Sequence, residues 1–195
     1  MTRTYFNEKA AIWDEVIAEK NVVKLQDMAR TLALKPGSTV LDVGTGTGVF
    51  VPFLLSQIGK SGRLVCLDFA EEMLNRARAK GFKGNVEYVC ADIASTRLED
   101  ETFDSVVCYS SFPHFQDKPS ALREINRVLR KSGKLFICHT SSRAEINEIH
   151  RHIPEVQDDL IPDEAEMRQM LSDAGFVDIK IDDDRDKYLA SARKI

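Results

Sequence analysis

Hydrophobic positions follow two alternating patterns along the chain. Short apolar runs, typical of buried strands, are separated by stretches in which apolar residues recur every three or four positions, typical of helices. The runs predict strands at about 38–44, 63–68, 86–92, 103–110 and 134–140. Because strands alternate with helices, the pattern predicts a parallel sheet connected by right-handed crossovers.

The stretches between and after these runs predict helices. Their approximate ranges are 47–59, 70–81, 119–131, 142–153 and 164–175. The last two begin at capping signatures, Ser142-x-x-Glu145 and Asp163-x-x-Glu166, in which the first side chain can accept a hydrogen bond from the backbone three residues later. Pro52 is compatible with the first helix only because it lies near the first turn.

The two ends of the chain add further elements. FVDIKI, the acidic turn 182–186 and KYLASARKI predict a terminal antiparallel hairpin. In about the first 20 residues, Ile12, Trp13, Val16 and Ile17 have the spacing of one amphipathic helix. The expected fold is therefore α/β and Rossmann-like. It has a seven-stranded, mostly parallel sheet, helices on both faces and the C-terminal hairpin.

The domain organisation expected from this pattern is simple. No repeat, low-complexity tract or linker interrupts the chain, so we expect one domain over 1–195. Within it, residues 1–30 form an N-terminal helical segment and residues 36–195 form the core.

Charge and composition narrow the range of partners. The 195 residues carry a net charge of −4, with Lys and Arg scattered along the chain, which argues against a nucleic-acid substrate. No apolar run approaches the roughly 18 residues of a membrane span. The start, MTRTYFNEKA, lacks the apolar core of a secretion signal, so a cytoplasmic protein is expected. The four cysteines lie in predicted strands without CxxC spacing and are expected to be buried free thiols.

Residues that could bind a ligand lie at the ends of the first three predicted strands. The first strand leads into Asp42-Val-Gly44-Thr-Gly46-Thr-Gly48, the second ends at Asp68 and the third at Asp92. In such a sheet, ligands bind beyond the carboxyl ends of the strands. Glycines let the backbone approach a ligand closely. An acidic residue after the second strand can accept hydrogen bonds from the hydroxyls of a ribose. The pattern indicates a nucleoside-type ligand.

The details of the glycine turn distinguish between nucleosides. A dinucleotide site is expected to have GxGxxG, whereas this chain has GxGxG preceded by Asp42. A carboxylate beside the turn repels a pyrophosphate and attracts an ammonium or sulfonium group. This favours S-adenosylmethionine over NAD.

Five segments resemble the successive motifs of class I S-adenosylmethionine-dependent methyltransferases. They are VLDVGTGTGVF, VCLDFAEEML, VCADI, FDSVVCYSSFPHF and ALREINRVLRKSGKLFI. The nearest group includes the ubiquinone and menaquinone C-methyltransferases, and the similarity covers about residues 36–140. The chain departs from the usual Pro-Gly-Gly, which is Lys131-Ser-Gly here, and from a histidine pair, which is Pro113-His114.

The resemblance implies a set of cofactor-binding residues. These are Asp42, Gly44, Thr45 and Gly46 at the methionine part, Asp68 at the ribose, Phe69 and Met73 beside the adenosine, Asp92 and Ile93 at the adenine, and Tyr109 near the methyl sulfonium. The function it implies is transfer of the methyl group to a small-molecule acceptor by in-line displacement.

The resemblance does not assign the residues on the acceptor side. Holding the acceptor in line supplies most of the acceleration, and an oxygen or carbon acceptor can also need a base. His114 and His139 follow the fourth and fifth strands and are candidates for pocket lining or acid–base catalysis. Phe6 and Trp13 either attach the N-terminal helix to the domain or form a lid that binds the acceptor. The segment 141–162 matches no substrate-binding motif.

A metal site is not expected. His150 and His152 are two residues apart on a predicted helix, so their side chains point in different directions. A set of Cys138, His139 and His150 lacks the spacing of known zinc sites.

Two other functions are compatible with parts of this pattern. A short dehydrogenase shares the sheet but requires the last glycine of GxGxxG, where this chain has Val49. A module that binds S-adenosylmethionine without catalysis and acts through a protein partner remains open, because a cofactor site does not prove turnover. The sequence assigns neither the acceptor nor an oligomeric state.

Overall fold

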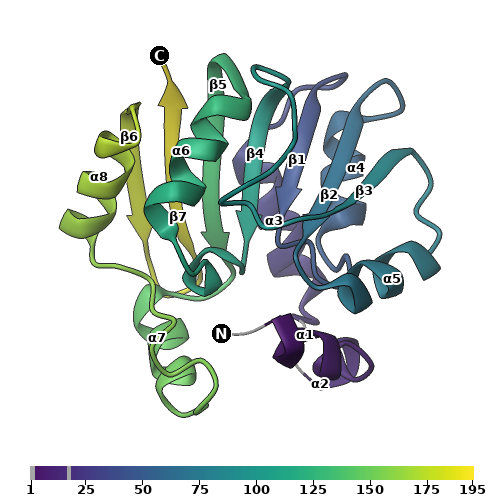
Figure 1. Cartoon of the computed structure of the whole chain (residues 1–195), viewed down its shortest axis with the longest axis vertical. Coiled ribbons are helices and arrows are strands. Elements are labelled where there is room, and N and C mark those ends of the chain that lie inside the picture. Colours follow the sequence, from purple (N-terminus) through teal and green to yellow (C-terminus); the bar gives the residue numbers. More distant parts are fainter. Residues whose placement is uncertain (1–2, 17–18) are drawn as a thin grey trace.

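A seven-stranded sheet forms the centre of the computed structural model, which describes residues 3–16 and 19–195 (Figure 1). The strands are β1 (Thr39–Val43), β2 (Arg63–Asp68), β3 (Asn85–Cys90), β4 (Phe103–Tyr109), β5 (Leu129–His139), β6 (Phe176–Asp183) and β7 (Tyr188–Lys194). Their order in the sheet is β3-β2-β1-β4-β5-β7-β6. Strands β1 to β5 pair in parallel, whereas β7 pairs antiparallel with both β5 and β6. The predicted fold, including the hairpin, is confirmed.

The winding of the sheet reverses at β1, which pairs with β2 on one side and β4 on the other. Strands β2 and β3 extend the sheet in one direction, and β4 and β5 extend it in the other. This point is where ligands bind in open α/β sheets.

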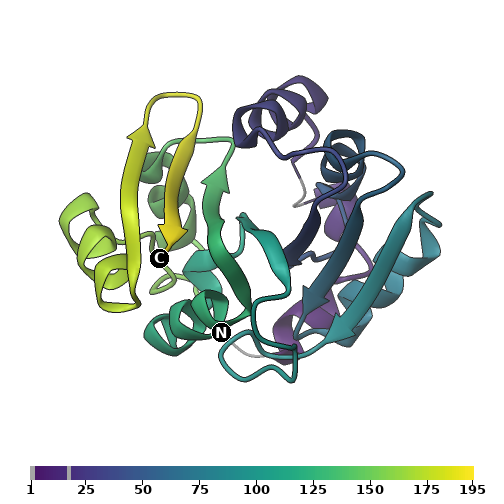
Figure 2. The ribbon, with the colours of Figure 1, turned by 90° about the horizontal axis from the view of Figure 1, so that it is seen from above.

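Helices cover both faces of the sheet (Figure 2). They are α1 (Arg3–Lys9), α2 (Trp13–Val16), α3 (Val22–Leu32), α4 (Val51–Ile58), α5 (Glu71–Ala79), α6 (Lys118–Val128), α7 (Arg143–Arg151) and α8 (Glu164–Asp173), with a 3₁₀ turn η1 (Phe112–His114). Ser142 and Asp163 cap α7 and α8 as predicted, accepting hydrogen bonds from the backbone of Glu145 and Glu166. None of the helices in the described ranges is both long and apolar enough to cross a membrane.

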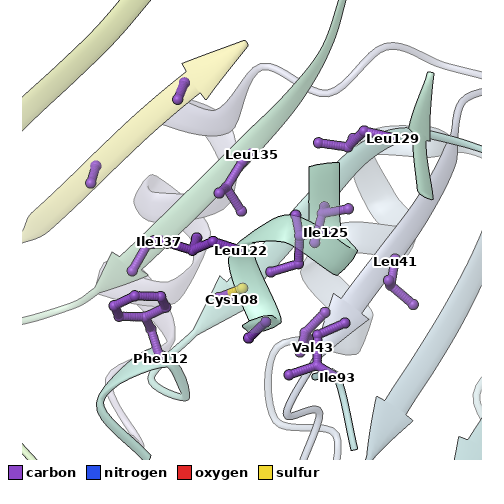
Figure 3. Close-up of a cluster of buried hydrophobic side chains, with 14 of the residues drawn as sticks. Leu41, Val43, Ile93, Cys108, Phe112, Leu122, Ile125, Leu129, Leu135 and Ile137 are labelled. Carbon is purple, nitrogen blue, oxygen red and sulfur yellow. The ribbon is translucent and has the colours of Figure 1, made fainter. Parts of the chain in front are cut away.

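Successive strand residues enter two separate cores because side chains alternate across a strand. Leu41, Val65 and Val106 pack with α6 and α8 on one face, in the cluster drawn in Figure 3. The neighbouring residues Val40 and Leu64 pack with α3 and α4 on the other face.

The N-terminal segment differs from the single amphipathic helix that was predicted. The chain turns after Lys9, so α1 and α2 are separate short helices, and α3 follows. The turn brings the Trp13 ring to 5.6 Å from the Phe6 ring, whereas Ile12 and Val16 are exposed. The predicted apolar stripe is wrong because, of its described members, Trp13 packs against the cluster around Phe6, whereas Ile12 and Val16 face solvent. Its fourth member, Ile17, lies outside the described residues.

The start of β5 also differs from the prediction. Helix α6 ends at Val128 rather than near Lys131, and Leu129 already has an extended backbone. Leu129 pairs with Phe103, whereas the next pair in the register is Ser105 with Lys134, which marks a bulge where Ser132 has φ of +64°. Leu129 continues the apolar spacing of α6 because it enters the same core, but it does so from a strand.

Three of the four cysteines are buried free thiols, as predicted. Cys66, Cys108 and Cys138 are buried, but Cys90 is exposed. Strand β3 lies at the edge of the sheet, so Cys90 has less cover than the other three.

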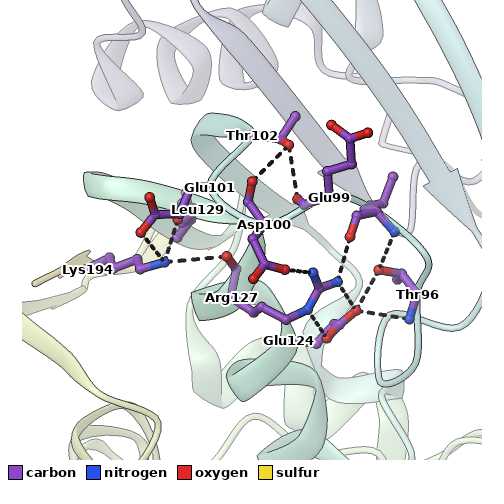
Figure 4. Close-up of polar contacts among 10 residues, drawn as sticks. Thr96, Glu99, Asp100, Glu101, Thr102, Glu124, Arg127, Leu129 and Lys194 are labelled. Atoms are coloured by element: carbon purple, nitrogen blue, oxygen red, sulfur yellow. Dashed lines mark hydrogen bonds and ion pairs between the residues drawn. The ribbon is translucent and has the colours of Figure 1, made fainter.

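A polar cluster fastens the loop after β3 to α6 (Figure 4). Glu124 accepts hydrogen bonds from Arg127 Nε at 2.8 Å and Nη2 at 2.7 Å, and from the Thr96 hydroxyl at 2.6 Å. Arg127 also donates to the carbonyl oxygen of Leu98 at 2.7 Å. The Arg127 guanidinium is the main cause that lowers the pKa of Glu124 to about 2.

Replacing Glu124 by glutamine is expected to lower the free energy of unfolding at pH 7 by about 1.5–3 kcal/mol, the range for hydrogen bonds to charged groups. Because the folded-state pKa is lowered from 4.5, the stabilisation is present above pH 4.5 and is lost as the pH falls towards 2. Urea unfolding at pH 7, 4 and 3 measures both effects. The exposed Glu99→Gln is the matched control, and equal losses in the two variants would contradict the prediction.

Candidate functional site

A cavity of about 380 Å³ lies at the carboxyl ends of the parallel strands. Helices α1, α2 and α7 lie at this end of the sheet (Figure 1). Of the residues predicted to bind cofactor, Gly44, Thr45, Gly46, Asp68, Phe69, Met73, Asp92, Ile93 and Tyr109 line the cavity, together with His114, His139, Phe6 and Trp13. Asp42 is not among the lining residues and lies buried behind the glycine turn.

The glycine turn after β1 needs glycine for two different reasons. Gly44 and Gly46 both have positive φ, +71° and +57°. A Cβ on Gly44 would lie 2.4 Å from Cβ of Ser111, so Gly44 permits contact with the chain after β4. A Cβ on Gly46 would meet nothing within 4 Å and would project into the cavity that Gly46 lines. Gly44 therefore serves the packing, and Gly46 leaves room for a ligand.

Two buried carboxylates end β1 and β2. Asp42 accepts a hydrogen bond from the Thr45 hydroxyl, and burial together with the nearby Asp68 raises its pKa to about 7. Asp68 accepts from the backbone N–H groups of Gly46 and Ala70, each at 2.8 Å, and burial raises its pKa to about 6. None of the lining residues in the described part of the chain is Lys or Arg. A positively charged ligand would therefore be favoured here.

The walls beside Asp68 are apolar. Met73 and Ile93 are buried, and the Phe69 ring lies 5.5 Å from the Phe6 ring of α1. Asp92 is exposed, and its Oδ1 accepts a hydrogen bond from the backbone N–H of Ala94 at 2.9 Å. A flat ring between these side chains would contact apolar surface on both sides and one carboxylate at its edge.

Tyr109 ends β4 and is held by a network that the sequence does not reveal. Its ring stacks on Phe50 at 4.4 Å, and its hydroxyl lies 3.2 Å from the Thr140 hydroxyl, which donates to Glu19 at 3.0 Å. Burial raises the pKa of Tyr109 to about 12, so its hydroxyl stays protonated. Glu19 also lines the cavity, but no local pattern marks it.

His114 and His139 line the same cavity in very different surroundings. His139 is buried with no hydrogen-bond partner on either ring nitrogen in the described residues, and burial lowers its pKa to about 3. His114 Nδ1 lies 2.9 Å from Asp159 Oδ2. Burial lowers the pKa of His114, and the hydrogen bond to Asp159 opposes this effect.

Helix α7 and the loop after it supply the wall that sequence reasoning left unassigned. His150 lines the cavity with its ring 5.0 Å from that of His114, whereas His152 is exposed. The loop is held by buried Asn147, which donates to the Ile161 carbonyl at 3.0 Å and accepts from the Ile161 N–H at 2.8 Å. The one sequence signal for this wall is the apolar spacing of Ile146, Ile149 and Ile153, all of which line the cavity.

Phe6 and Trp13 close the cavity from the N-terminal side. Phe6 is buried, and its ring lies 5.5 Å from both the Phe69 and His114 rings. Helix α2 is anchored through Asp14, which accepts from the Thr47 hydroxyl and pairs with Lys80 at 2.7 Å. Both aromatic side chains thus pack within the domain and also face the cavity.

No group of three or more His, Cys, Asp or Glu side chains in the described ranges is arranged to hold a metal ion. Cys138, His139 and His150 therefore do not form such a group.

Comparisons with known proteins agree with the order of the motifs. A family described as a methyltransferase domain matches residues 41–137. The chain is 36% identical over 112 residues to a ubiquinone/menaquinone biosynthesis C-methyltransferase of Enterobacter sp., covering 55% of this chain and 45% of that protein. It is 28% identical over 174 residues to the protein of the same name from Klebsiella pneumoniae, covering 75% of this chain and 69% of that protein. The chain thus spans less than half of the Enterobacter relative.

The whole fold is also found among solved structures. One is a methyltransferase in a complex with the Trm112 methyltransferase activator of Haloferax volcanii, with a TM-score of 0.78, 22% identity and 96% of each chain covered. One assignment follows from the sheet order, the glycine turn, the carboxylates at the strand ends and the sequence matches. The chain belongs to the class I S-adenosylmethionine-dependent methyltransferases, near the ubiquinone and menaquinone C-methyltransferase group.

Proposed function

We propose that the chain binds S-adenosylmethionine in this cavity and transfers its methyl group to a small-molecule acceptor. The observation that carries the proposal is the pair of buried carboxylates, Asp42 and Asp68, at the ends of adjacent strands, with no Lys or Arg among the lining residues that the structure describes. Such a site suits a cation that also carries hydroxyl groups, and it disfavours a pyrophosphate.

Each part of the cofactor has a matching group in the cavity. Asp68 would accept the ribose hydroxyls, Phe69 and Met73 would flank the adenosine, and Asp92 with Ile93 would meet the adenine. Asp42 would act on the methionine part from behind the glycine turn, mainly through its charge, because it does not line the cavity. When bound, S-adenosylmethionine supplies a methyl group on a sulfonium, which is already a good leaving group.

The remaining wall would bind the acceptor. The cavity volume of about 380 Å³ is near the lower end of the roughly 300–1,000 Å³ usual for ligand sites, and it must hold two ligands. This favours a compact acceptor. Phe6, Trp13 and α7 would exclude water and hold the acceptor in line, and His114 would take a proton from the acceptor.

Calorimetry with S-adenosylmethionine, S-adenosylhomocysteine and NAD tests the cofactor. We expect the first two to bind and NAD not to bind; binding of NAD alone would overturn the proposal. Transfer of an isotope-labelled methyl group to a metabolite extract then tests catalysis. Binding without any transfer would favour a non-catalytic module that acts through a partner.

Replacing Gly46 by alanine is expected to weaken S-adenosylmethionine binding by at least tenfold, because the added Cβ would occupy cavity space. Alanine at positive φ also costs about 1–2 kcal/mol of stability. Gly81→Ala is the matched control, since Gly81 has φ of +61° and open space but does not line the cavity. Similar melting temperatures with a loss of affinity only in Gly46→Ala are expected; equal affinities would contradict the prediction.

Binding of S-adenosylmethionine near pH 6.5 is expected to release protons. Burial raises the pKa values of Asp42 and Asp68 to about 7 and 6, so part of each is protonated at this pH, and a cation favours the charged forms. Affinity should therefore fall as the pH is lowered from 8 to 5.5. Calorimetry at pH 6.5 in buffers of different ionisation enthalpy measures the protons released. Asp68→Asn should release fewer, and proton uptake by the wild type would refute the expectation.

A further inference from the structure

Asp159 contacts two cavity-lining histidines through two different oxygen atoms. Its carboxylate Oδ2 lies 2.9 Å from His114 Nδ1, and its main-chain carbonyl oxygen is hydrogen-bonded to His150 Nδ1. The His114 and Asp159 side chains are only 16% and 14% exposed. One residue in the loop after α7 therefore fixes two rings that come from η1 and α7.

These contacts decide which ring nitrogen carries hydrogen. A carbonyl oxygen only accepts hydrogen bonds, and so does an ionised carboxylate. The His114 hydrogen bond is the main influence that lowers the pKa of Asp159 against the effect of burial, so the carboxylate is ionised. Nδ1 must then donate in both rings. A neutral imidazole has a single N–H, so Nε2 of each ring is left as a lone-pair acceptor.

The surroundings of His114 limit how many protons the two rings can take. His150 lies 5.0 Å away between ring centroids, Lys118 and His139 are further basic groups nearby, and Asp159 is the opposing carboxylate. Lys118 donates to the Pro113 and Phe115 carbonyls at 2.8 and 3.2 Å. A proton on one ring disfavours a proton on the other. Burial and these basic neighbours lower the pKa of His114, so its ring is favoured in the neutral form and can take up one proton.

We propose that Asp159 is a positioning residue that holds His114 and His150 with unprotonated Nε2 atoms available to the acceptor. The inference rests on the proposed methyl transfer and adds to it a class of acceptor, one that donates a hydrogen bond from a hydroxyl, thiol or amine group. As the new bond to the methyl carbon forms and the bond from sulfur to that carbon breaks, the acceptor proton moves to His114 Nε2. The imidazolium formed is stabilised by the Asp159 carboxylate.

Nitrogen NMR of the full chain with ¹⁵N-labelled histidine tests the tautomers without cofactor or acceptor. In the wild type, we expect neutral His114 and His150 to be protonated at Nδ1, with signals assigned through His114→Gln and His150→Gln. In Asp159→Ala, His114 loses its acceptor and its Nδ1-protonated fraction falls, whereas His150 keeps its tautomer because the main-chain carbonyl remains. The adjacent, exposed Asp158→Asn is the matched control and should change neither ring.

Nε2 protonation of neutral His114 in the wild type would overturn the proposal, as would an unchanged His114 in Asp159→Ala. Failure of the wild type to bind S-adenosylmethionine would refute the proposed function instead and would leave the tautomer result standing.

Turnover provides a second test with the isosteric Asp159→Asn. We expect the affinity for S-adenosylmethionine to be unchanged and turnover to fall by roughly 10–10²-fold, less than the 10²–10⁴-fold expected when the base itself is removed. Without the carboxylate charge, the pKa of His114 falls, so the acidic limb of the pH–rate profile should move to lower pH. Turnover and profile equal to those of Asp158→Asn would refute the positioning role.

Discussion

Replacing Asp68 by alanine is expected to weaken S-adenosylmethionine binding by at least tenfold while the protein still folds. The substitution would remove the two charge-assisted hydrogen bonds that Asp68 is proposed to accept from ribose hydroxyls, and each such bond contributes roughly 1.5–3 kcal/mol. It also removes the acceptor for the backbone N–H groups of Gly46 and Ala70, so the glycine turn loses a support. Calorimetry gives the dissociation constant, and circular dichroism with thermal melting checks the fold.

Asp68→Asn separates the two effects of that substitution. The amide retains one oxygen acceptor for the turn but loses the charge, so the melting temperature should stay closer to that of the wild type while affinity still falls. A folded Asp68→Ala protein with an unchanged dissociation constant would show that the end of β2 does not bind the ribose.

Replacing His114 by alanine is expected to leave cofactor affinity unchanged and to reduce turnover by about 10²–10⁴-fold, the usual range for acid–base assistance. His114→Gln should reduce turnover almost as much, because an amide cannot take the proton. Methyl-transfer rates at saturating S-adenosylmethionine measure the effect once an acceptor is found in the labelling experiment.

His139→Ala should have the smaller effect of the two histidine variants. Burial lowers the pKa of His139 to about 3, which makes it a weak base, and neither ring nitrogen has a hydrogen-bond partner among the described residues to stabilise an added proton. If both Ala variants turn over within a few-fold of the wild type, the acid–base proposal is wrong and catalysis rests on positioning alone.

The sheet and the cofactor side could be predicted because their signals are local. Strand residues such as Leu41 and Val65 lie in apolar runs, and Asp42, Gly44 and Asp68 stand at the ends of those runs in sequence. The boundaries that were wrong depend on tertiary contacts. Leu129 fits the helical spacing of α6, but pairing with Phe103 makes it a strand residue.

The acceptor wall could not be predicted in the same way. The contact between His114 and Asp159 joins residues 45 positions apart. His114 lies in a segment that resembles a family motif, but no motif marks Asp159. His150 was weighed only as a metal ligand, because the bond from its ring to the Asp159 carbonyl depends on how the loop after α7 folds back. The helical spacing of Ile146 and Ile149 indicates an apolar face, but the sequence does not indicate that this face lines the cavity.

The position of β7 between β5 and β6 has a consequence for synthesis on the ribosome. Strands β1 to β4 and one side of β5 can pair as they emerge, but the other side of β5 must wait for residues 188–194. At about 5–20 residues per second, the roughly 50 residues between His139 and Tyr188 take about 2.5–10 s to translate. During that interval β5, whose second half carries the apolar run 135–138, is an open sheet edge, the kind of surface that pairs with other chains. The nascent protein is therefore most exposed to aggregation just before its final strand is made.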